Sequence, residues 1–222
     1  MHVRVDAKIK EDFPNLLILT ALIKGLEIKK KDARLESLKM KVINEVKDKY
    51  NITSLKDLPT IRLYRNFFWK IGIDPTKRRP AAEALIRRIL SGGGLPRINT
   101  FVDSLNLASI KSEVPIASFD VDKIFGKPVL RYAVKGEKFY GIGMKEPMSL
   151  KGGEIVISDN EGIIAIYPYR DSERTKITED TYNALLIFCG VPDISLDKLQ
   201  EARDITIKLV GEFCGGVVAL EN

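Results

Sequence analysis

Few of the residue types that support common enzyme and metal chemistry occur in this chain of 222 residues. Its single histidine is His2, so a Ser-His-Asp triad, a Cys-His pair and a histidine-ligated metal are excluded. Two cysteines, Cys189 and Cys214, are too few for a disulfide framework or a four-ligand zinc site. We predict that both are buried thiols in a reducing compartment. Any hydrolysis must therefore use carboxylates, hydroxyls, lysine, backbone groups or the substrate itself.

Long apolar runs are also missing from the sequence. The longest, Leu16–Leu19, is far too short to cross a bilayer, and no apolar segment follows a basic start. We therefore expect a cytoplasmic protein with no membrane partner. The chain has one glutamine, Gln200, against 36 basic and 30 acidic residues. Because thermophile proteins favour Lys and Glu over thermolabile amides, this composition predicts a thermophilic source.

Glycine-rich nucleotide motifs are incomplete in this sequence. Gly141-Ile142-Gly143 lacks the third glycine and the following helix of a dinucleotide fingerprint, and no Walker lysine pattern occurs. The sequence therefore predicts no NAD or ATP cofactor, and it offers no set of metal ligands.

The length and a hydrophobic fraction of 45% predict a globular protein with a sizeable core. No linker-like composition interrupts the chain, so we expect residues 1–222 to form a single domain. Its helix-rich part covers about residues 1–95. Residues 15–28 fit either a helix or a strand, of which we favour a buried strand. Helices are predicted at about 29–50, 57–72, 80–92 and 98–110.

After Pro115, short apolar segments alternate with glycine and Asp-Asn turn signals, which predicts strands. Ser195 is a good N-cap for a final helix over about 195–214 that carries an apolar stripe. The predicted fold class is therefore α+β: N-terminal helices, an antiparallel β core within about 96–192, and a covering helix. The predicted strands are 129–134, 138–142, 154–158, 162–167 and 184–189.

Three polar side chains share one face of the predicted 98–110 helix. Asn99, Asp103 and Asn106 are separated by four and three positions, which places them on the same side of a helix. Such a stripe of amides and a carboxylate can hydrogen-bond a polar ligand, or it can be a solvated helix face. The spacing alone leaves both interpretations open.

A second polar cluster, Tyr167–Thr175, follows a predicted strand and contains two tyrosines, two arginines, two carboxylates and two hydroxyls. Loops on a rigid β scaffold often hold binding sites. Arg170 can hold a carboxylate or phosphate through two parallel hydrogen bonds, and Asp171 can orient a water or accept a hydroxyl proton. The alternative is an exposed turn with local ion pairs of little energetic value.

Basic residues recur between residues 62 and 97, and the chain carries a formal net charge of +6. Lys77-Arg78-Arg79 precedes a predicted helix N-terminus, where free N–H groups attract anions. These features suit a nucleic-acid backbone, and scattered surface arginines are also typical of thermophiles. Trp69 is expected in the core and not on a stacking surface. The candidate phosphate-binding residues are Arg62, Arg65, Lys77, Arg78, Arg79, Arg87 and Arg88.

Residues 96–192 resemble a known family in the order and spacing of four segments. These segments are Val102–Asn106, Pro115–Ile124, Leu130–Glu137 and Thr175–Thr181. They are similar to the B-three/B-four tRNA-editing domain of the phenylalanyl-tRNA synthetase β subunit. The whole chain, including Arg78–Leu85, looks like the stand-alone versions of that domain. The resemblance implies a β-sandwich with added helices, and hydrolysis of tyrosine wrongly attached to tRNA.

Around the amino-acid pocket the sequence departs from the family pattern. Ala117 occupies the position of a usual histidine and is followed by Ser118, and Leu105 replaces the usual threonine before the retained Asn106. Residues 167–172 stand where the synthetase has a glycine-rich pocket wall. We therefore expect a rebuilt pocket, and tyrosine specificity is not carried over.

Our first functional hypothesis is a free-standing aminoacyl-tRNA deacylase that acts in trans, with tRNA as partner and no DNA specificity. The alternatives are an RNA-binding module without catalysis, and a small-molecule enzyme or sensor on the same scaffold. The hypothesis specifies neither the amino acid, nor the tRNA, nor the oligomeric state. It assigns catalysis to Asn106, Arg170 and Asp171, and substrate contacts to Asp103, Ser118, Tyr167, Ser172 and Thr175.

Overall fold

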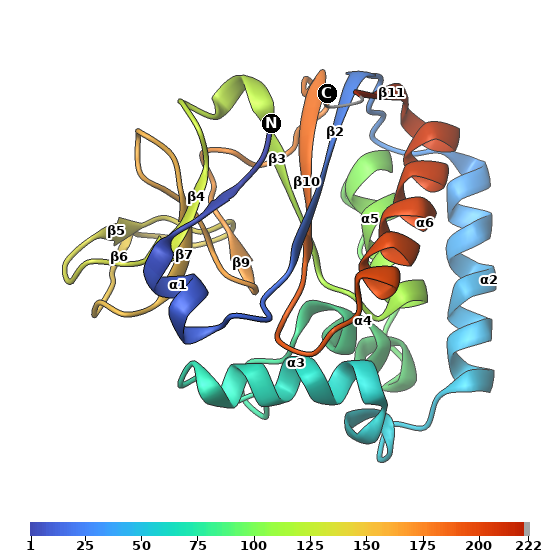
Figure 1. Ribbon diagram of the computed structural model, residues 1–222. Coiled ribbons are helices and arrows are strands. Elements are labelled where there is room, and N and C mark those ends of the chain that lie inside the picture. Colours follow the sequence, from blue (N-terminus) through green and yellow to red (C-terminus); the bar gives the residue numbers. More distant parts are fainter. Residues whose placement is uncertain (220–222) are drawn as a thin grey trace.

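Three layers make up the computed structural model, which describes residues 1–219 (Figure 1). A five-stranded sheet forms one outer layer and a four-stranded sheet the middle layer. Helices cover the other face of the four-stranded sheet. The predicted α+β class with a sandwich-like β core is thereby confirmed.

The four-stranded sheet has the order β11-β2-β10-β3, and its neighbouring strands are antiparallel. Its central strand β10 is buried from Ala184 to Cys189, because the second sheet covers one face and helices the other. A strand covered on both faces is a continuous apolar run without polar alternation, as here. The bounds are β2 (Ile18–Leu26), β3 (Ile116–Asp120), β10 (Asn183–Cys189) and β11 (Gly215–Ala219).

The five-stranded sheet has the order β1-β4-β7-β8-β9, in which only the β1–β4 pair is parallel among the described strands. A small two-stranded sheet, β5–β6, lies beside it, and a bridge between Gly141 and Ser172 joins the two. The bounds are β1 (Arg4–Val5), β4 (Val129–Tyr132), β5 (Lys138–Phe139), β6 (Met148–Ser149), β7 (Ile155–Ser158), β8 (Ile163–Ile166) and β9 (Arg170–Asp171).

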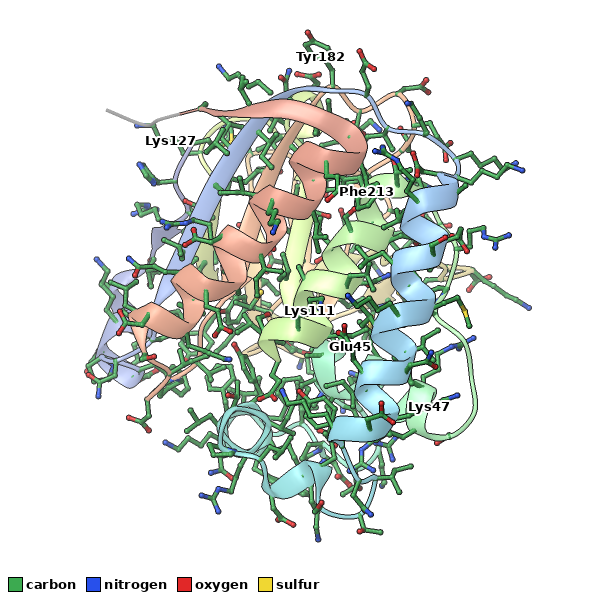
Figure 2. The ribbon with its side chains drawn as sticks, turned by 90° about the vertical axis from the view of Figure 1, so that its right-hand side faces the viewer. Glu45, Lys47, Lys111, Lys127, Tyr182 and Phe213 are labelled. Carbon is green, nitrogen blue, oxygen red and sulfur yellow. The ribbon has the colours of Figure 1, made fainter. Side chains whose placement is uncertain are left out.

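Three long helices form the second outer layer, with α5 lying between α2 and α6 (Figure 2). Each begins at a side chain that accepts hydrogen bonds from free backbone N–H groups: Asp32, Asn99 and Ser195. Two further helices, α3 and α4, lie across one end of the layers. The helix bounds are α1 (Ala7–Asp12), α2 (Ala33–Lys49), α3 (Pro59–Lys70), α4 (Ala81–Leu90), α5 (Thr100–Ser112) and α6 (Leu196–Cys214).

Trp69 is the clearest correction to the sequence analysis. Its side chain is 56% exposed, whereas Tyr64 and Phe68 on the same helix are fully buried. One residue along a helix turns the side chain by about 100°, so Trp69 leaves the apolar face that Phe68 occupies. The prediction that Trp69 lies in the core was wrong.

Other sequence predictions hold. The segment 15–28 contains the strand β2, Pro59 is the first residue of α3, and Ser195 caps α6. Cys189 and Cys214 are buried and free, as predicted. Within residues 1–219, no helix combines the length and the apolar character that a membrane span requires.

Candidate functional site

Asp171 lies in β9, where the five-stranded sheet approaches β3 and β10. Its carboxyl group faces the backbone N–H of Ser118 in β3 and the thiol of Cys189 in β10. Burial raises the pKa of Asp171 to about 7, and the Ser118 N–H opposes this shift by stabilising the charged form. A carboxyl group with such a pKa can accept and release a proton near neutral pH, which an ordinary aspartate cannot do efficiently.

Arg170 precedes Asp171, and successive side chains of a strand point to opposite faces. The Arg170 guanidinium donates a hydrogen bond to the Ile142 carbonyl at 3.1 Å. It also lies against Gly141, where an added Cβ would come within 2.8 Å of the Arg170 Nε atom. Gly141 therefore makes room for this arginine. Arg170 and Asp171 thus have separate hydrogen-bond partners.

A small pocket opens beside Asp171. Its volume is about 70 Å³, and since one water takes about 30 Å³ of liquid, it has room for about two waters. The pocket can thus hold a water next to a titratable carboxyl group. Its lining residues are Ala81, Pro115, Ile116, Ala117, Pro168, Tyr169, Arg170, Asp171 and Cys189.

Cys189 is a second titratable side chain at this pocket. Burial raises the pKa of its thiol far above the ordinary value, and the nearby Asp171 charge raises it further. The thiol is therefore neutral at physiological pH, and since only a thiolate is an effective nucleophile, Cys189 is not suited to covalent catalysis. The chemistry of this pocket rests on Asp171.

Tyr167, Ser172 and Thr175, predicted to contact substrate, are buried and bonded within the protein. The Tyr167 hydroxyl donates to the Gly190 carbonyl, and the Ser172 and Thr175 hydroxyls lie 2.9 Å apart. Tyr64 of α3, which the sequence analysis missed, donates to the Cys189 carbonyl at 2.7 Å. Two tyrosines thus hold the end of β10 behind the pocket, and no local pattern signals this because the partners are far apart in sequence.

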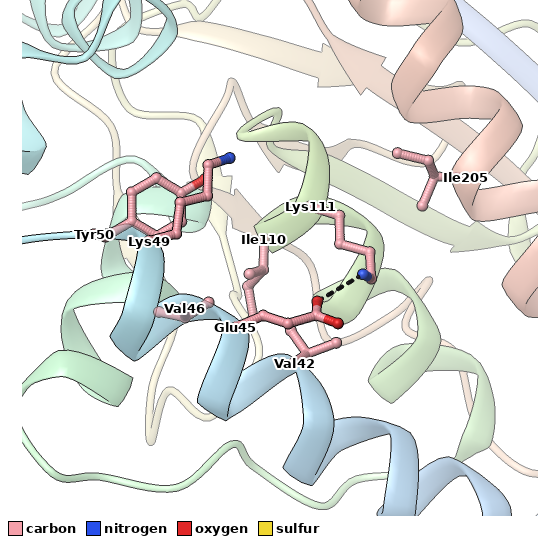
Figure 3. Close-up of a pocket in the computed structure, with 8 residues that line it drawn as sticks. All are labelled: Val42, Glu45, Val46, Lys49, Tyr50, Ile110, Lys111 and Ile205. Atoms are coloured by element: carbon pink, nitrogen blue, oxygen red, sulfur yellow. Dashed lines mark hydrogen bonds and ion pairs between the residues drawn. The ribbon is translucent and has the colours of Figure 1, made fainter.

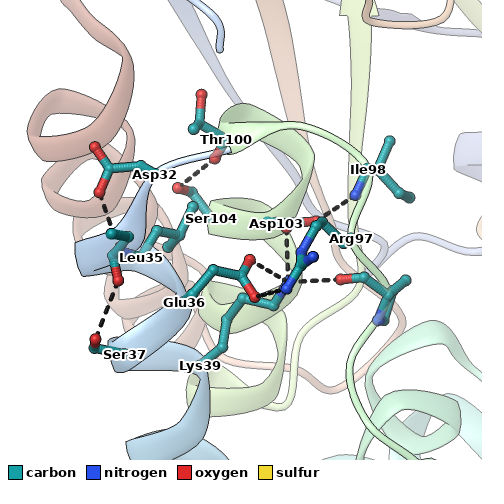
Figure 4. Close-up of polar contacts among 12 residues, drawn as sticks. Asp32, Leu35, Glu36, Ser37, Lys39, Arg97, Ile98, Thr100, Asp103 and Ser104 are labelled. Carbon is teal, nitrogen blue, oxygen red and sulfur yellow. Dashed lines mark hydrogen bonds and ion pairs between the residues drawn. The ribbon is translucent and has the colours of Figure 1, made fainter. Parts of the chain in front are cut away.

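The polar face of α5 contacts α2 and does not line the pocket (Figure 4). The Asp103 carboxylate accepts hydrogen bonds from Lys39 Nζ at 2.8 Å and from the Ile98 N–H at 3.1 Å. Asn99 caps the helix through the Val102 N–H. Asn106 is half-buried and is not a pocket-lining residue either. Neither the ligand-binding nor the solvated interpretation describes Asp103, which forms a buried ion pair.

The candidate phosphate-binding residues divide into two groups. Arg65 and Arg87 both bind the fully buried carboxylate of Glu83, at 2.9 and 2.7 Å, so they neutralise an internal charge. Arg88 donates to the Gly94 carbonyl at 2.6 Å, and Arg78 stacks on Tyr169. The exposed residues without an ion partner inside residues 1–219 are Arg62, Lys77 and Arg79, together with the solvent-facing Arg78 and Arg88.

The basic segment Lys77–Arg79 leads directly to the small pocket. Arg79 is followed by Pro80, the N-cap residue of α4. Ala81, the first residue of α4, lines the pocket. No side chain caps this helix end, and Ala82 and Glu83 in its first turn are buried. The positive charge of residues 77–79 and of the helix N-terminus therefore lies beside the pocket that contains Asp171.

The helical layer contains a separate cavity of about 320 Å³ between α2, α5 and α6 (Figure 3). An ion pair between Glu45 and Lys111, 3.1 Å apart, forms part of its wall. None of the residues that the sequence proposed as functional lines this cavity. It is not part of the Asp171 site.

Residues 63–215, which include every residue that lines the small pocket, match the B3/4 domain. The chain belongs to the B3/4 domain family. The match covers more than half of the chain and extends from α3 to the end of α6. The resemblance noted from the sequence is thereby confirmed.

Relatives of this B3/4 domain include beta subunits of phenylalanine–tRNA ligase. That of Mycoplasma pneumoniae is 32% identical over 104 residues, which are 47% of this chain and 12% of the relative. That of Fusobacterium nucleatum subsp. nucleatum is 36% identical over 90 residues, 40% of this chain and 11% of the relative. That of Psychrobacter arcticus is 32% identical over 157 residues, 58% of this chain and 19% of the relative. The chain thus spans at most 19% of these relatives.

A solved structure shares the fold of this B3/4 domain. It is an N-terminal fragment of the phenylalanyl-tRNA synthetase beta subunit from Pyrococcus horikoshii, with a TM-score of 0.51 and 20% sequence identity. The superposition covers 97% of this chain and 49% of the fragment. The helices that precede residue 63 therefore belong to the shared architecture as well.

Proposed function

We propose that this B3/4 domain binds aminoacyl-tRNA and hydrolyses the ester bond of a mischarged amino acid, as a separate chain acting in trans. One observation carries the proposal: a carboxyl group with a pKa of about 7 borders a pocket of water size. The match to the B3/4 domain supports tRNA as the partner. Such a protein works in the cytoplasm, where charged tRNA is present.

Asp171 acts as the base in the proposed reaction. It takes a proton from a water in the pocket, and the water oxygen bonds to the ester carbonyl carbon. The carbon–oxygen bond to the ribose then breaks, and Asp171 returns the proton to the departing ribose oxygen. An aminoacyl ester is intrinsically labile, so positioning and proton transfer supply most of what is needed. Cys189 stays neutral and takes no part.

The acidic tRNA backbone is held, in this proposal, by the exposed basic residues near α4. Lys77, Arg78 and Arg79 precede the uncapped N-terminus of α4, and Arg62 adds a further positive charge. Arg65 and Arg87 are left out because both are bound to the buried carboxylate of Glu83. We expect the affinity for tRNA to fall steeply with salt, since each phosphate contact releases counterions.

The test is the replacement Asp171→Asn, assayed on a panel of misacylated tRNAs. Loss of the base is expected to lower the deacylation rate by about 10²–10⁴-fold without weakening tRNA binding. The exposed carboxylate of Asp180 supplies the control Asp180→Asn, for which the rate stays unchanged. A wild-type rate in the Asp171 variant would remove this residue from the mechanism.

A tRNA-binding module without hydrolytic activity is the second candidate. The volume of the pocket favours it, because about 70 Å³ is small for an amino-acid side chain. In the deacylase the side chain must therefore lie outside the pocket, with only the ester at its mouth. Salt-sensitive tRNA binding together with no ester cleavage on any misacylated tRNA would establish the binding module instead.

A further inference from the structure

A larger cavity, of about 460 Å³, lies next to the Asp171 site and shares Tyr169 with it. Its walls are the connection between α3 and α4, the chain from β6 to β7, and the chain from β8 to β9. Apolar residues such as Ile71, Met148 and Leu150 line part of it, and its lining includes three charged residues: Arg78, Lys151 and Glu154. Volume and lining are those of a small-molecule site.

Glu154 supplies an unsatisfied acceptor in this cavity wall. Its Oε1 atom accepts a hydrogen bond from the Lys151 N–H at 2.9 Å. Its Oε2 atom is closed off from solvent and has no hydrogen-bond partner within residues 1–219. Folded proteins leave few buried polar atoms unpaired, and a carboxylate oxygen is among the least favourable to leave so. The position calls for a donor, and a charged ammonium group is the strongest.

The backbone beside Glu154 can give a ligand access to this oxygen. Gly152 and Gly153 precede it, both exposed, with φ angles of +89° and +88°. Glycine adopts such positive φ values without strain and has more backbone freedom than any other residue. A ligand reaches the Glu154 Oε2 atom only if this turn shifts, and in the turn the Gly153 N–H donates to the Ala133 carbonyl at 3.0 Å.

The other side of the cavity is cationic. The Arg78 guanidinium lies over the Tyr169 ring, 4.7 Å from its centroid, and donates to the Tyr169 hydroxyl at 2.8 Å. This fixes the guanidinium at the cavity, yet within residues 1–219 neither Arg78 nor Lys151 has a carboxylate partner. Burial raises the pKa of Tyr169, Arg78 lowers it and Glu154 raises it, so both charges lie close to the same ring.

We propose that this cavity binds a free α-amino acid with a large apolar side chain. The ammonium group binds Glu154 Oε2, and the carboxylate binds Arg78 and Lys151. The side chain packs against Ile71, Met148 and Leu150. A zwitterion is the ligand class that answers an unpaired anion and two unpaired cations at once. The inference does not depend on deacylation, because Asp171 and Cys189 do not line this cavity.

The experiment titrates the full chain with L-phenylalanine, L-leucine and L-methionine, by calorimetry and by the rise in melting temperature. At least one is expected to bind with a dissociation constant below about 1 mM and to raise the melting temperature. Phenylalanine amide lacks the carboxylate and 3-phenylpropanoate lacks the ammonium group. Each is expected to bind at least tenfold more weakly. No binding by any of the three amino acids at about 10 mM would overturn the proposal.

Two variants locate the site. Glu154→Gln removes the charge but keeps the side-chain shape, and Arg78→Met removes the guanidinium from an exposed position, so both are expected to fold. Each should weaken amino-acid binding at least tenfold, whereas the control Glu161→Gln, at an exposed site, should leave it unchanged. Wild-type affinity in the Glu154 variant would overturn the assignment.

The variant Asp171→Asn separates this proposal from the deacylase. It should retain amino-acid binding even where it loses ester hydrolysis. Loss of amino-acid binding in a folded Asp171 variant would show one shared site and overturn the second cavity. Failure of deacylation in the wild type would leave the amino-acid titration unaffected.

Discussion

Buried carboxylates differ between the helical layer and the junction of the two sheets. In the helical region, Asp103 binds Lys39 and Glu83 binds Arg65 and Arg87. At the sheet junction, Asp171 forms no ion pair within residues 1–219, and burial raises its pKa to about 7. A buried charge that is paired holds elements together, whereas one that is left unpaired becomes titratable at neutral pH. Burial of a carboxylate alone therefore does not indicate a function; the nearby cations do.

The largest effect is expected where pairing is broken in the helical layer. Lys39→Met leaves Asp103 buried without its cation and should lower the free energy of unfolding by about 3–5 kcal/mol. Urea unfolding measures this, and Lys41→Met, at an exposed position of the same helix, should change it by less than about 0.5 kcal/mol. A loss below about 1 kcal/mol for Lys39→Met would contradict the structural role of the pair.

The sheet junction should respond with the opposite sign. The pKa of Asp171 rises from 3.8 to about 7 on folding, so the folded protein binds this proton more tightly than the unfolded chain. Wild-type stability therefore falls as the pH rises from about 4 to 7, and Asp171→Asn removes this loss. The variant should be more stable than the wild type by about 2–3 kcal/mol at pH 8.

Unfolding curves at pH 4 and pH 8 test this, because the two proteins should differ little at the lower pH. If the stability difference between the variant and the wild type is the same at pH 4 and at pH 8, Asp171 ionises with an ordinary pKa. Increased stability with reduced deacylation would mark Asp171 as a position where function is retained at the expense of stability.

The smallest effect is expected from an exposed pair in the helical layer. Glu45 and Lys111 are 3.1 Å apart, with side chains that are 46% and 34% exposed. Glu45→Gln should lower the free energy of unfolding by less than about 1 kcal/mol, with a further decrease of the effect at high salt. Urea unfolding at two salt concentrations measures both. An effect as large as that of Lys39→Met would show that pairing, and not burial, determines how much stability is lost when an ion pair is broken.

Elements with a clear period could be predicted from the sequence. The helices α2, α3 and α6 lie where their apolar stripes and caps placed them, and the apolar run of β10 indicated a strand. The strands β1, β6 and β9 have two residues each, which is too short for any alternation to show. The edge strands β3 and β11 were also not predicted, since their formation depends on neighbouring strands.

The candidate site could be predicted only in part. Asp171 was proposed from its place in a polar turn, and the structure places it at a pocket. Of the proposed group, Arg170 and Asp171 both line this pocket, whereas Asn106 does not. Helical spacing predicted Asp103 on a polar face of its helix, but nothing local indicated that Lys39, 64 residues earlier, lies opposite. The Glu154 cavity had no sequence signal, because its walls come from three distant segments.

The amino-acid sequence by itself determined which reactive groups this protein possesses, where its long helices run, and the family-like order of its central segments. Those features follow from residue identity and local periodicity. Only the tertiary structure decided which buried carboxylates are neutralised and which one keeps a titratable proton. A pKa depends on burial and on charges within a few ångströms, and residues distant in the chain supply both.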